Sequence, residues 1–497
     1  MSVAEPNLSN ESYQKIYDVI IVGAGLSGIG TAYWLQQKCP DQEFTILEAR
    51  DALGGTWDLF RYPGIRSDSD MFTFGYRFKP WKNPQSLSDG ASILNYLRET
   101  AQENGIDKKI RYGHQVIRAS WDDEETGWTI DVQTTHKNVR MRARFLYMCS
   151  GYYHYEKAHR PTFAGEENFR GKIVLPQFWP KDLDYQGKQI VIVGSGATAV
   201  TLVPTLSEKA RHVTMLQRSP TYVMNLPKRN NLFVQLKKWL PERAAYRITR
   251  WSNLLLGMTF YRLSRSFPHV IKRFIIRDAS KRLGPGYQVN KHFNPRYNPW
   301  DQRLCVVPDG DLFEAIRQGK ASVVTDEISH FTSRGIQLKS GEELPADLIV
   351  LATGLNIKLL GGVVLTVNGK PVNPNEEIVY KGMMLSEVPN FVMAFGYTNA
   401  SWTLKTDLTA NYVCKLLNYM AKKGYQIVAP RRQRNVAPEP FLNFQSGYIQ
   451  RADSLLPKQG SRRPWRVYQN YLMDMMTTRY GRVDDGVLEF KSKAKKG

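Results

Sequence analysis

The stretch YDVIIVGAGLSGIGTAYWLQQKCPDQEFTILE, residues 17–48, decides the fold of this chain. Its β-branched run at residues 18–22 is typical of a buried strand in a parallel sheet. The glycine-rich turn GAGLSG, residues 23–28, follows at once, and a helical segment continues from it. A second apolar run, residues 44–47, ends at Glu48. Strand, turn, helix, strand and acid in this order predict a dinucleotide-binding unit.

Each part of this turn has a physical role. Gly23 permits the tight turn, Gly25 lets a pyrophosphate approach the backbone, and Gly28 lets helix and strand pack closely. The start of the helix, which includes Ser27, offers free N–H groups to phosphates. Glu48 is placed to accept hydrogen bonds from ribose hydroxyls. We therefore predict a nucleotide site here; the alternative is a plain glycine-rich turn in an α/β domain.

A second unit of the same kind occupies residues 189–219. An apolar strand at 189–193 is followed by GSGATA, a helix to about residue 207 and another strand at 212–217. Arg218 stands where the first unit has Glu48. A guanidinium can pair with a 2′-phosphate that a carboxylate would repel, so we predict FAD at the first unit and NADPH at the second; a solvated arginine is the alternative. The predicted residues are Gly194, Ser195, Gly196, Ala197, Thr198, Ala199, Val200, Arg218 and Ser219.

Composition narrows the class of protein. With 497 residues, the chain suits about three domains at ~150 residues each. Its net charge of +22 favours contact with anions: phosphorylated cofactors, a membrane surface or nucleic acid. Four scattered cysteines without a CxxC pair argue against a disulfide framework, a zinc site or a redox dithiol, and we predict no metal. A polar, acidic N-terminus is no signal peptide, so we expect a cytoplasmic protein.

Between residues 228 and 282 the sequence is helix-like, aromatic and strongly basic. It holds fourteen Lys and Arg against two acidic residues. Basic amphipathic helices can lie on anionic membranes, so peripheral membrane association is one interpretation. A helical subdomain with a solvated basic face is the other. Nothing here resembles a nucleic-acid-reading module, so we expect no nucleic acid partner.

The loop GGTW, residues 54–57, and the segment RYPGIRSD, residues 61–68, concentrate glycine, aromatic and charged residues. Loops of this kind carry sites. Backbone exposed at Gly55 can approach a flat ring, and Trp57 can cover one. For Asp68, the alternative is a surface ion pair with the neighbouring Arg61 or Arg66.

The predicted fold class is therefore α/β: two Rossmann-like dinucleotide-binding domains, for FAD and NADPH, with a basic helical insert. Two such units imply hydride transfer from nicotinamide to flavin, with oxygen as the default electron acceptor. The predicted boundaries are 1–155 (FAD domain, first part), 156–225 (NADPH domain, first part), 226–295 (helical insert), 296–360 (NADPH domain, second part) and 361–497 (FAD domain, C-terminal part).

Several motifs then resemble one enzyme family. Gly54-Gly55-x-Trp57-x4-Tyr62-Pro63-Gly64-x3-Asp68 matches a loop motif of type I Baeyer–Villiger monooxygenases, and Phe169-x-Gly171-x3-Leu175-x3-Trp179 resembles their FxGxxxHxxxW signature. The segment DLIVLATG is similar to the ATG segment of class B flavin monooxygenases. The phrases RYPGIRSDSDMFTFGYRF, GSGATAVTLVP, NPWDQRLC and GYTNASWTLK are most similar to the branch of the ethionamide-activating monooxygenase.

This resemblance implies FAD, NADPH and O2, with a flavin C4a-peroxide that oxygenates ketones to esters or oxidises sulfides. Arg303 matches the catalytic arginine, which would stabilise the negative intermediates, and Asp68 would orient it. The resemblance also places these cofactor contacts: Gly55, Thr56, Trp57, Asp58 and Leu59 along the flavin, Arg66, Ser67 and Asp68 where nicotinamide and flavin meet, and Val116 at the FAD adenine.

The chain departs from the family signature at one position. Leu175 stands at the signature histidine, and leucine neither forms side-chain hydrogen bonds nor titrates. We hypothesise that the protein reduces its flavin but oxygenates less efficiently and leaks peroxide. An N- or S-oxygenating flavin monooxygenase, or an uncoupled NADPH oxidase, is the enzyme alternative. A flavin-loaded membrane-surface or partner-binding protein is the non-enzyme alternative.

Overall fold

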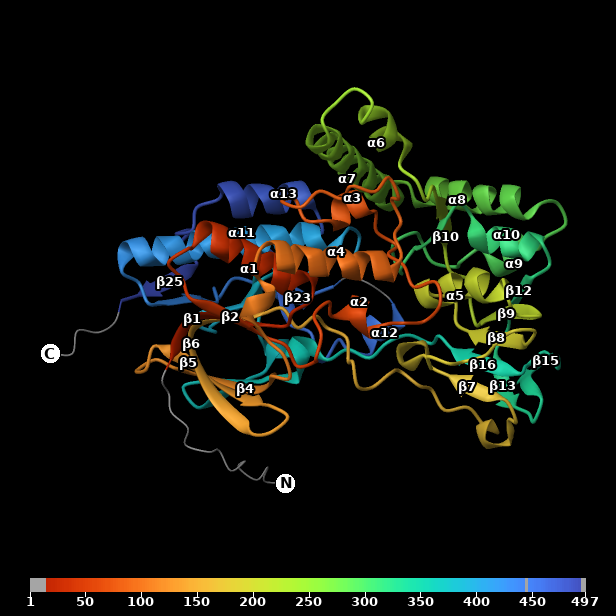
Figure 1. Cartoon of the computed structure of the whole chain (residues 1–497), viewed down its shortest axis with the longest axis horizontal. Helices are drawn as coiled ribbons and strands as arrows, with labels where there is room; N and C mark the ends of the chain where they lie inside the picture. The colour runs from red at the N-terminus through yellow and green to blue at the C-terminus, as the bar shows by residue number, and fades with distance from the viewer. Residues whose placement is uncertain (1–14, 443–445, 493–497) are drawn as a thin grey trace.

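A computed structural model of the chain describes residues 15–442 and 446–492. Two sheets lie side by side in it, with the N-terminal sheet on the left of Figure 1 and the second sheet on the right. Three helices of the 226–295 region, Asn231–Leu236, Glu242–Ser266 and Pro268–Leu283, lie along the upper edge of the same view. Both sheets are built around a parallel core, which confirms the predicted α/β class.

The first sheet is centred on β1 (Ile16–Val22), the strand predicted at residues 18–22. This strand pairs in parallel with β2 (Phe44–Leu47) on one side and with β6 (Asn138–Met148) on the other. The strands β4 and β5 form an antiparallel meander onto β6, and C-terminal strands complete the sheet. The remaining members are β3 (Ile110–Arg111), β4 (Gln115–Asp122), β5 (Gly127–Gln133), β17 (Val364–Val367), β18 (Lys370–Val372) and β21 (Phe391–Met393).

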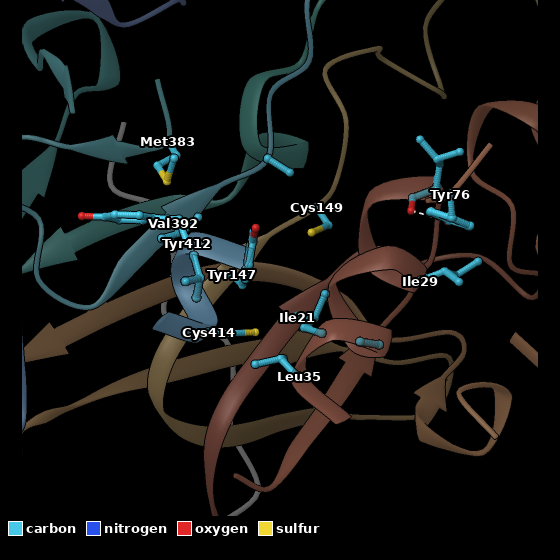
Figure 2. Close-up of a cluster of buried hydrophobic side chains, with 14 of the residues drawn as sticks. Ile21, Ile29, Leu35, Tyr76, Tyr147, Cys149, Met383, Val392, Tyr412 and Cys414 are labelled. Carbon is cyan, nitrogen blue, oxygen red and sulfur yellow. Dashed lines mark hydrogen bonds between the residues drawn. The ribbon is translucent and has the colours of Figure 1, made fainter. Parts of the chain in front are cut away.

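Helix α1 (Leu26–Lys38) packs between this sheet and α11 (Trp402–Lys423). Figure 2 shows the buried side chains that join them, with Ile21 on β1, Leu35 on α1 and Cys414 on α11. Most of the residues from Leu26 to Leu35 are buried between the two elements, and the polar end of α1, at Gln37 and Lys38, is exposed. The C-terminal part of the chain therefore closes the first nucleotide unit.

The second sheet is entirely parallel, in the order β12-β9-β8-β16-β7. Its central strands, β8 and β16, are nearly continuous apolar runs, as expected where both faces of a sheet are covered. The helix after β8 is α5, which lies where the sequence predicted it. The elements are β7 (Lys172–Val174), β8 (Gln189–Val193), α5 (Ala197–Ser207), β9 (His212–Gln217), α10 (Asp311–Arg317), β12 (Ala321–Thr325) and β16 (Leu348–Leu351). A separate antiparallel sheet is formed by β13 (Ile328–Phe331), β14 (Gly335–Leu338) and β15 (Glu343–Pro345).

The predicted helical insert is confirmed as helices α6 (Asn231–Leu236), α7 (Glu242–Ser266), α8 (Pro268–Leu283) and α9 (Val289–His292). They lie between two short paired strands, β10 (Val223–Leu226) and β11 (Cys305–Pro308). Among the described helices, none combines the length and apolar composition needed to cross a bilayer. The domain boundaries themselves stay a prediction.

Shorter elements connect these units. They are α2 (Thr56–Leu59), α3 (Met71–Phe74), α4 (Gly90–Glu103), α12 (Gly447–Gln450), α13 (Tyr471–Met475), β19 (Val379–Tyr380), β20 (Met384–Leu385), β22 (Ile427–Pro430), β23 (Pro438–Pro440), β24 (Lys458–Gly460) and β25 (Leu488–Lys491). All four cysteines are free and buried.

The insert is fastened to the first unit by a buried arginine. Arg250, on the inner face of α7, donates hydrogen bonds to the carbonyls of Phe72 and Gly75, at 2.7 and 2.8 Å. These carbonyls belong to α3 and the residue after it. A buried guanidinium is tolerated only where carbonyl or carboxylate oxygens surround it. The contact therefore fixes where α7 crosses the molecule.

Replacing this arginine is expected to destabilise the protein. Arg250→Met should lower the free energy of unfolding by about 2–4 kcal/mol, because buried carbonyls lose their donor. Arg247→Met, at an exposed position one turn away, is the matched control and should change it by less than about 0.5 kcal/mol. Denaturant unfolding monitored by tryptophan fluorescence measures both. Equal stability of the two variants would contradict this role of Arg250.

Candidate functional site

One large cavity runs between the two sheets. Its volume is 2640 Å³, and both glycine-rich turns line it. From the sites predicted in the sequence, its wall includes Gly23, Gly25, Ser27, Glu48, Gly55, Thr56, Trp57, Leu59, Arg66, Ser67, Asp68, Val116, Gly194, Ser195, Gly196, Ala197, Thr198, Arg218 and Arg303. Residues from separate parts of the sequence thus meet at one site.

The first turn has the geometry that its glycines predicted. Gly23 adopts a left-handed conformation, with φ of 106°. A Cβ atom at Gly28 would lie 1.9 Å from the Gly23 carbonyl oxygen, so this position tolerates no side chain. At Gly25 a Cβ atom would meet only the Gly55 backbone, at 3.7 Å. Gly25 also lines the cavity, so a phosphate could approach its backbone from that side.

Glu48 is buried at the end of β2 and holds the turn in place. Its carboxylate accepts hydrogen bonds from the backbone N–H groups of Ala24 at 2.7 Å and Arg50 at 3.0 Å. Burial raises the pKa of this carboxyl group above its ordinary value. Each oxygen has a further lone pair, so the carboxylate can still accept a hydrogen bond from a ligand in the cavity.

The second turn repeats the first. Gly194 has a φ of 135°, and a Cβ atom there would lie 2.3 Å from the Ala352 carbonyl oxygen. A Cβ atom at Gly196 would meet no atom within 4 Å. The Ser195 hydroxyl lies 2.7 Å from that of Thr221. Arg218 is exposed just after β9 and lines the cavity, with its guanidinium available to an anion.

Arg303 carries a fixed positive charge into the cavity. Its Nε and Nη2 atoms donate to Oδ2 of Asp68, at 3.0 and 2.5 Å. Asp68 raises the pKa of Arg303 well above its ordinary value, so the guanidinium stays charged. The Arg303 side chain is still 40% exposed, and the two residues lie 235 positions apart in the sequence. The remaining donors of the guanidinium can therefore reach a ligand.

The sequence left an ion pair of Asp68 with Arg61 or Arg66 as an alternative, and the structure shows different pairings. Arg61 pairs with Asp58 at 2.9 Å. Arg66 pairs with Asp311, at the start of α10, at 2.5 Å. Asp68 pairs with Arg303, and this alternative interpretation is wrong. Two ion pairs thus connect the 61–68 loop with the second unit.

Some predicted cofactor residues lie outside the cavity wall, each for a packing reason. Asp58 is buried and pairs with Arg50 at 2.7 Å as well as with Arg61. Gly28, Ala199 and Val200 are buried in the helices that follow the turns. Ser219 is exposed beyond β9. These residues shape the two turns or flank them.

Sequence reasoning missed a group of tyrosines in the cavity wall. Three of them, Tyr152, Tyr153 and Tyr155, follow β6 and line the cavity. Tyr62 lines the same cavity, although it is distant from them in the sequence. Burial raises the pKa of Tyr62, Tyr153 and Tyr155 to about 12. These phenols therefore stay protonated and can donate hydrogen bonds at neutral pH. The run YYHY directly after a strand was the available signal.

Leu175 does not line the cavity. It packs against the apolar cluster of the second unit and precedes a short 3-10 turn, η3 (Pro176–Phe178). Within this turn, the buried Gln177 donates to the carbonyls of His154 and Tyr155, at 2.8 and 2.7 Å. The signature segment is thus linked to the cavity through Gln177, two residues after the position of the missing histidine.

Comparison with known proteins shows the family. Residues 17–384 match the flavin-binding monooxygenase-like family. The FAD-containing monooxygenase EthA of Mycolicibacterium smegmatis is 53% identical over 476 residues, which cover 95% of this chain and 97% of that protein. The probable FAD-binding monooxygenase AlmA of Acinetobacter baylyi is 48% identical over 484 residues, covering 97% of each. The family resemblance seen in the sequence is therefore confirmed.

A solved structure shares the fold at low sequence identity. An oxidised steroid monooxygenase bound to NADP matches with a TM-score of 0.76 and 19% identity, covering 96% of this chain and all of that one. The two chains therefore share their fold over nearly their whole length.

The two open glycines allow the two nucleotide sites to be tested separately. Gly25→Ala should weaken FAD binding about tenfold or more, because the methyl group occupies the space of a phosphate. Gly196→Ala should raise KM for NADPH by a similar factor and leave FAD content unchanged. Flavin absorbance per protein and steady-state NADPH oxidation measure the two effects. Each variant is the control for the other, and loss of FAD in both would contradict the assignment.

Proposed function

Since this chain belongs to the flavin-binding monooxygenase-like family, we propose that it is a Baeyer–Villiger-type monooxygenase that uses FAD, NADPH and O2. Its substrates would be ketones, converted to esters, and thioethers, converted to sulfoxides. The observation that carries this proposal is the Arg303–Asp68 ion pair in a cavity shared by both glycine-rich turns.

The residues present fit the two cofactors. Gly25 and Gly196 leave space beside the backbone at the start of a helix, as a pyrophosphate requires. Glu48 at the first unit suits an unphosphorylated ribose, whereas Arg218 at the second suits a 2′-phosphate. FAD would therefore occupy the first unit and NADPH the second. Together they supply the electrons that activate O2.

Arg303 would contribute electrostatic stabilisation. Oxygen transfer to a carbonyl develops negative charge on oxygen, and a fixed cation in a partly enclosed cavity lowers the energy of that charge. Asp68 holds two donors of the guanidinium and leaves the others free. Asp68 is thus a positioning residue, and Arg303 is the proposed catalytic residue. The protonated Tyr153 and Tyr155 add donors to the same wall.

Removing the Arg303 guanidinium tests this proposal. Arg303→Ala should lower the rate of product formation about 10²–10³-fold while FAD stays bound. Asp68→Asn should lower it less, since the amide oxygen still accepts a hydrogen bond from the arginine. Arg211→Ala, at an exposed arginine outside the cavity wall, is the control. Gas chromatography of products from a linear ketone, a cyclic ketone and a thioether measures the rates, and unchanged rates in Arg303→Ala would refute the role.

An uncoupled NADPH oxidase is the second candidate, because Leu175 stands at the signature histidine. Leu175→His should raise the ratio of product formed to NADPH consumed and lower peroxide release, if the histidine couples the two steps. Leu175 lies two residues before Gln177, which donates hydrogen bonds to the carbonyls of His154 and Tyr155. Leu183→His, at a buried leucine of the second unit, is the control for introducing a histidine into an apolar cluster of this unit. An unchanged ratio would show that Leu175 does not cause uncoupling.

A further inference from the structure

The outward face of α7 is apolar. Ile248, Trp251, Leu255, Leu256 and Leu263 are all exposed, and Leu256 is the most exposed at 66%. These positions recur at the spacing of one helix face. The opposite face, with Tyr246, Arg250 and Leu254, is buried against the protein. An apolar stripe of this length is unusual on a surface that contacts only water.

The apolar stripe continues beyond α7. Phe267, Val270 and Phe274 are exposed around the start of α8, with values of 58, 62 and 60%. Trp239, in the loop between α6 and α7, is 84% exposed. Figure 1 shows this loop as the highest point of the insert, beside α7. We call Trp239 and the exposed apolar residues of α7 and α8 the insert face.

Unpaired cations surround the insert face. The exposed basic residues of the α6–α7 loop, α7 and α8 whose side chains form no ion pair or hydrogen bond within residues 15–442 and 446–492 are Lys238, Arg243, Arg247, Arg262, Arg273, Arg277 and Lys281. The acids of the segment, Glu242 and Asp278, are already engaged by Lys237 and Arg282. The electrostatic potential at this surface is therefore strongly positive.

The same residues border the catalytic cavity. Leu255, Leu256 and Phe274 are exposed on the insert face and also line the cavity. Buried neighbours such as Leu254 and Ile275 continue the apolar wall inward. The insert face is thus continuous with the interior of the cavity.

From this geometry we infer that the insert face docks on the surface of an anionic lipid bilayer and that lipophilic substrate passes from the bilayer into the cavity past Leu255, Leu256 and Phe274. Exposed tryptophan and leucine with flanking arginine and lysine suit the boundary between headgroups and acyl chains. Anionic headgroups would neutralise the unpaired cations. A second copy of this chain is a poorer occupant, because a twofold contact would bring the same cations together. The passage of substrate rests on the proposed function, whereas docking does not.

Vesicle flotation with the full-length, FAD-containing protein tests the docking. Binding to vesicles of phosphatidylglycerol and phosphatidylcholine should exceed binding to pure phosphatidylcholine at least about tenfold, and should fall as salt rises from 0.05 to 0.5 M. The triple variant Trp239→Ser, Arg273→Glu, Arg277→Glu should lose this binding. These residues do not line the cavity, so turnover of a water-soluble thioether should be unchanged.

A matched control carries the same kinds of change elsewhere. Leu455→Ser with Lys370→Glu alters an exposed apolar residue and an exposed lysine outside the insert, and should bind vesicles like the unaltered protein. Equal vesicle binding by the triple variant and this control would overturn the proposal. So would a dimer, seen by analytical ultracentrifugation without lipid, that dissociates in the triple variant. If vesicle binding holds but no substrate is oxygenated, the proposed function fails and the docking stands.

Passage of substrate has its own measurement. A long-chain ketone dissolved in anionic vesicles should be oxidised about tenfold faster by the unaltered protein than by the triple variant. The rate should rise in proportion to the amount of protein bound to the vesicles. A short water-soluble ketone should show no difference. Equal rates on the vesicle-bound ketone would overturn the passage of substrate from the bilayer.

Discussion

The ion pair between Arg303 and Asp68 is the interaction on which the site depends. It joins a loop of the first nucleotide unit to the segment that returns from the insert, 235 residues later. A guanidinium inside a cavity is costly unless a carboxylate and further acceptors face it. Asp68 meets that requirement without covering the arginine. The Arg66–Asp311 pair gives the same loop a second connection to the second unit.

The two nucleotide units share the backbone conformation of their glycine-rich turns and differ in the charged residue that follows the second strand of each unit. Both first glycines have left-handed φ values, and both second glycines line the cavity. The third position is glycine in one unit and alanine in the other. At Gly28 the Gly23 carbonyl leaves no room for a Cβ atom, whereas the buried Ala199 is accommodated. Past the next strand, a buried Glu48 contrasts with an exposed Arg218, and in the proposed function this difference in charge distinguishes the two cofactors.

Local sequence patterns predicted the fold because its decisive features are local. The strands at 189–193 and 212–217 and the helix ending at residue 207 match the structure, since apolar runs and glycine turns set their limits. The family motifs also led to Arg303 and Asp68. Contacts between distant segments were not predictable. No sequence pattern indicates the Arg66–Asp311 ion pair or the hydrogen bonds from Gln177 to the carbonyls of residues 154 and 155. Asp58, predicted beside the flavin, lies outside the cavity wall because its buried carboxylate pairs with Arg50 and Arg61.

The insert is best understood through its two faces. Its inward arginine, Arg250, is satisfied by backbone carbonyls and fixes α7 on the first unit. Its outward side combines exposed apolar residues with unpaired cations. In water, exposed apolar side chains stay hydrated and neighbouring cations repel one another, and both effects raise the free energy of the protein. A surface that supplies both anions and an apolar layer removes both costs at once. Some of the exposed apolar residues also border the cavity. The contact of the insert with a bilayer and the route of a lipophilic substrate into the cavity are therefore explained by the same residues.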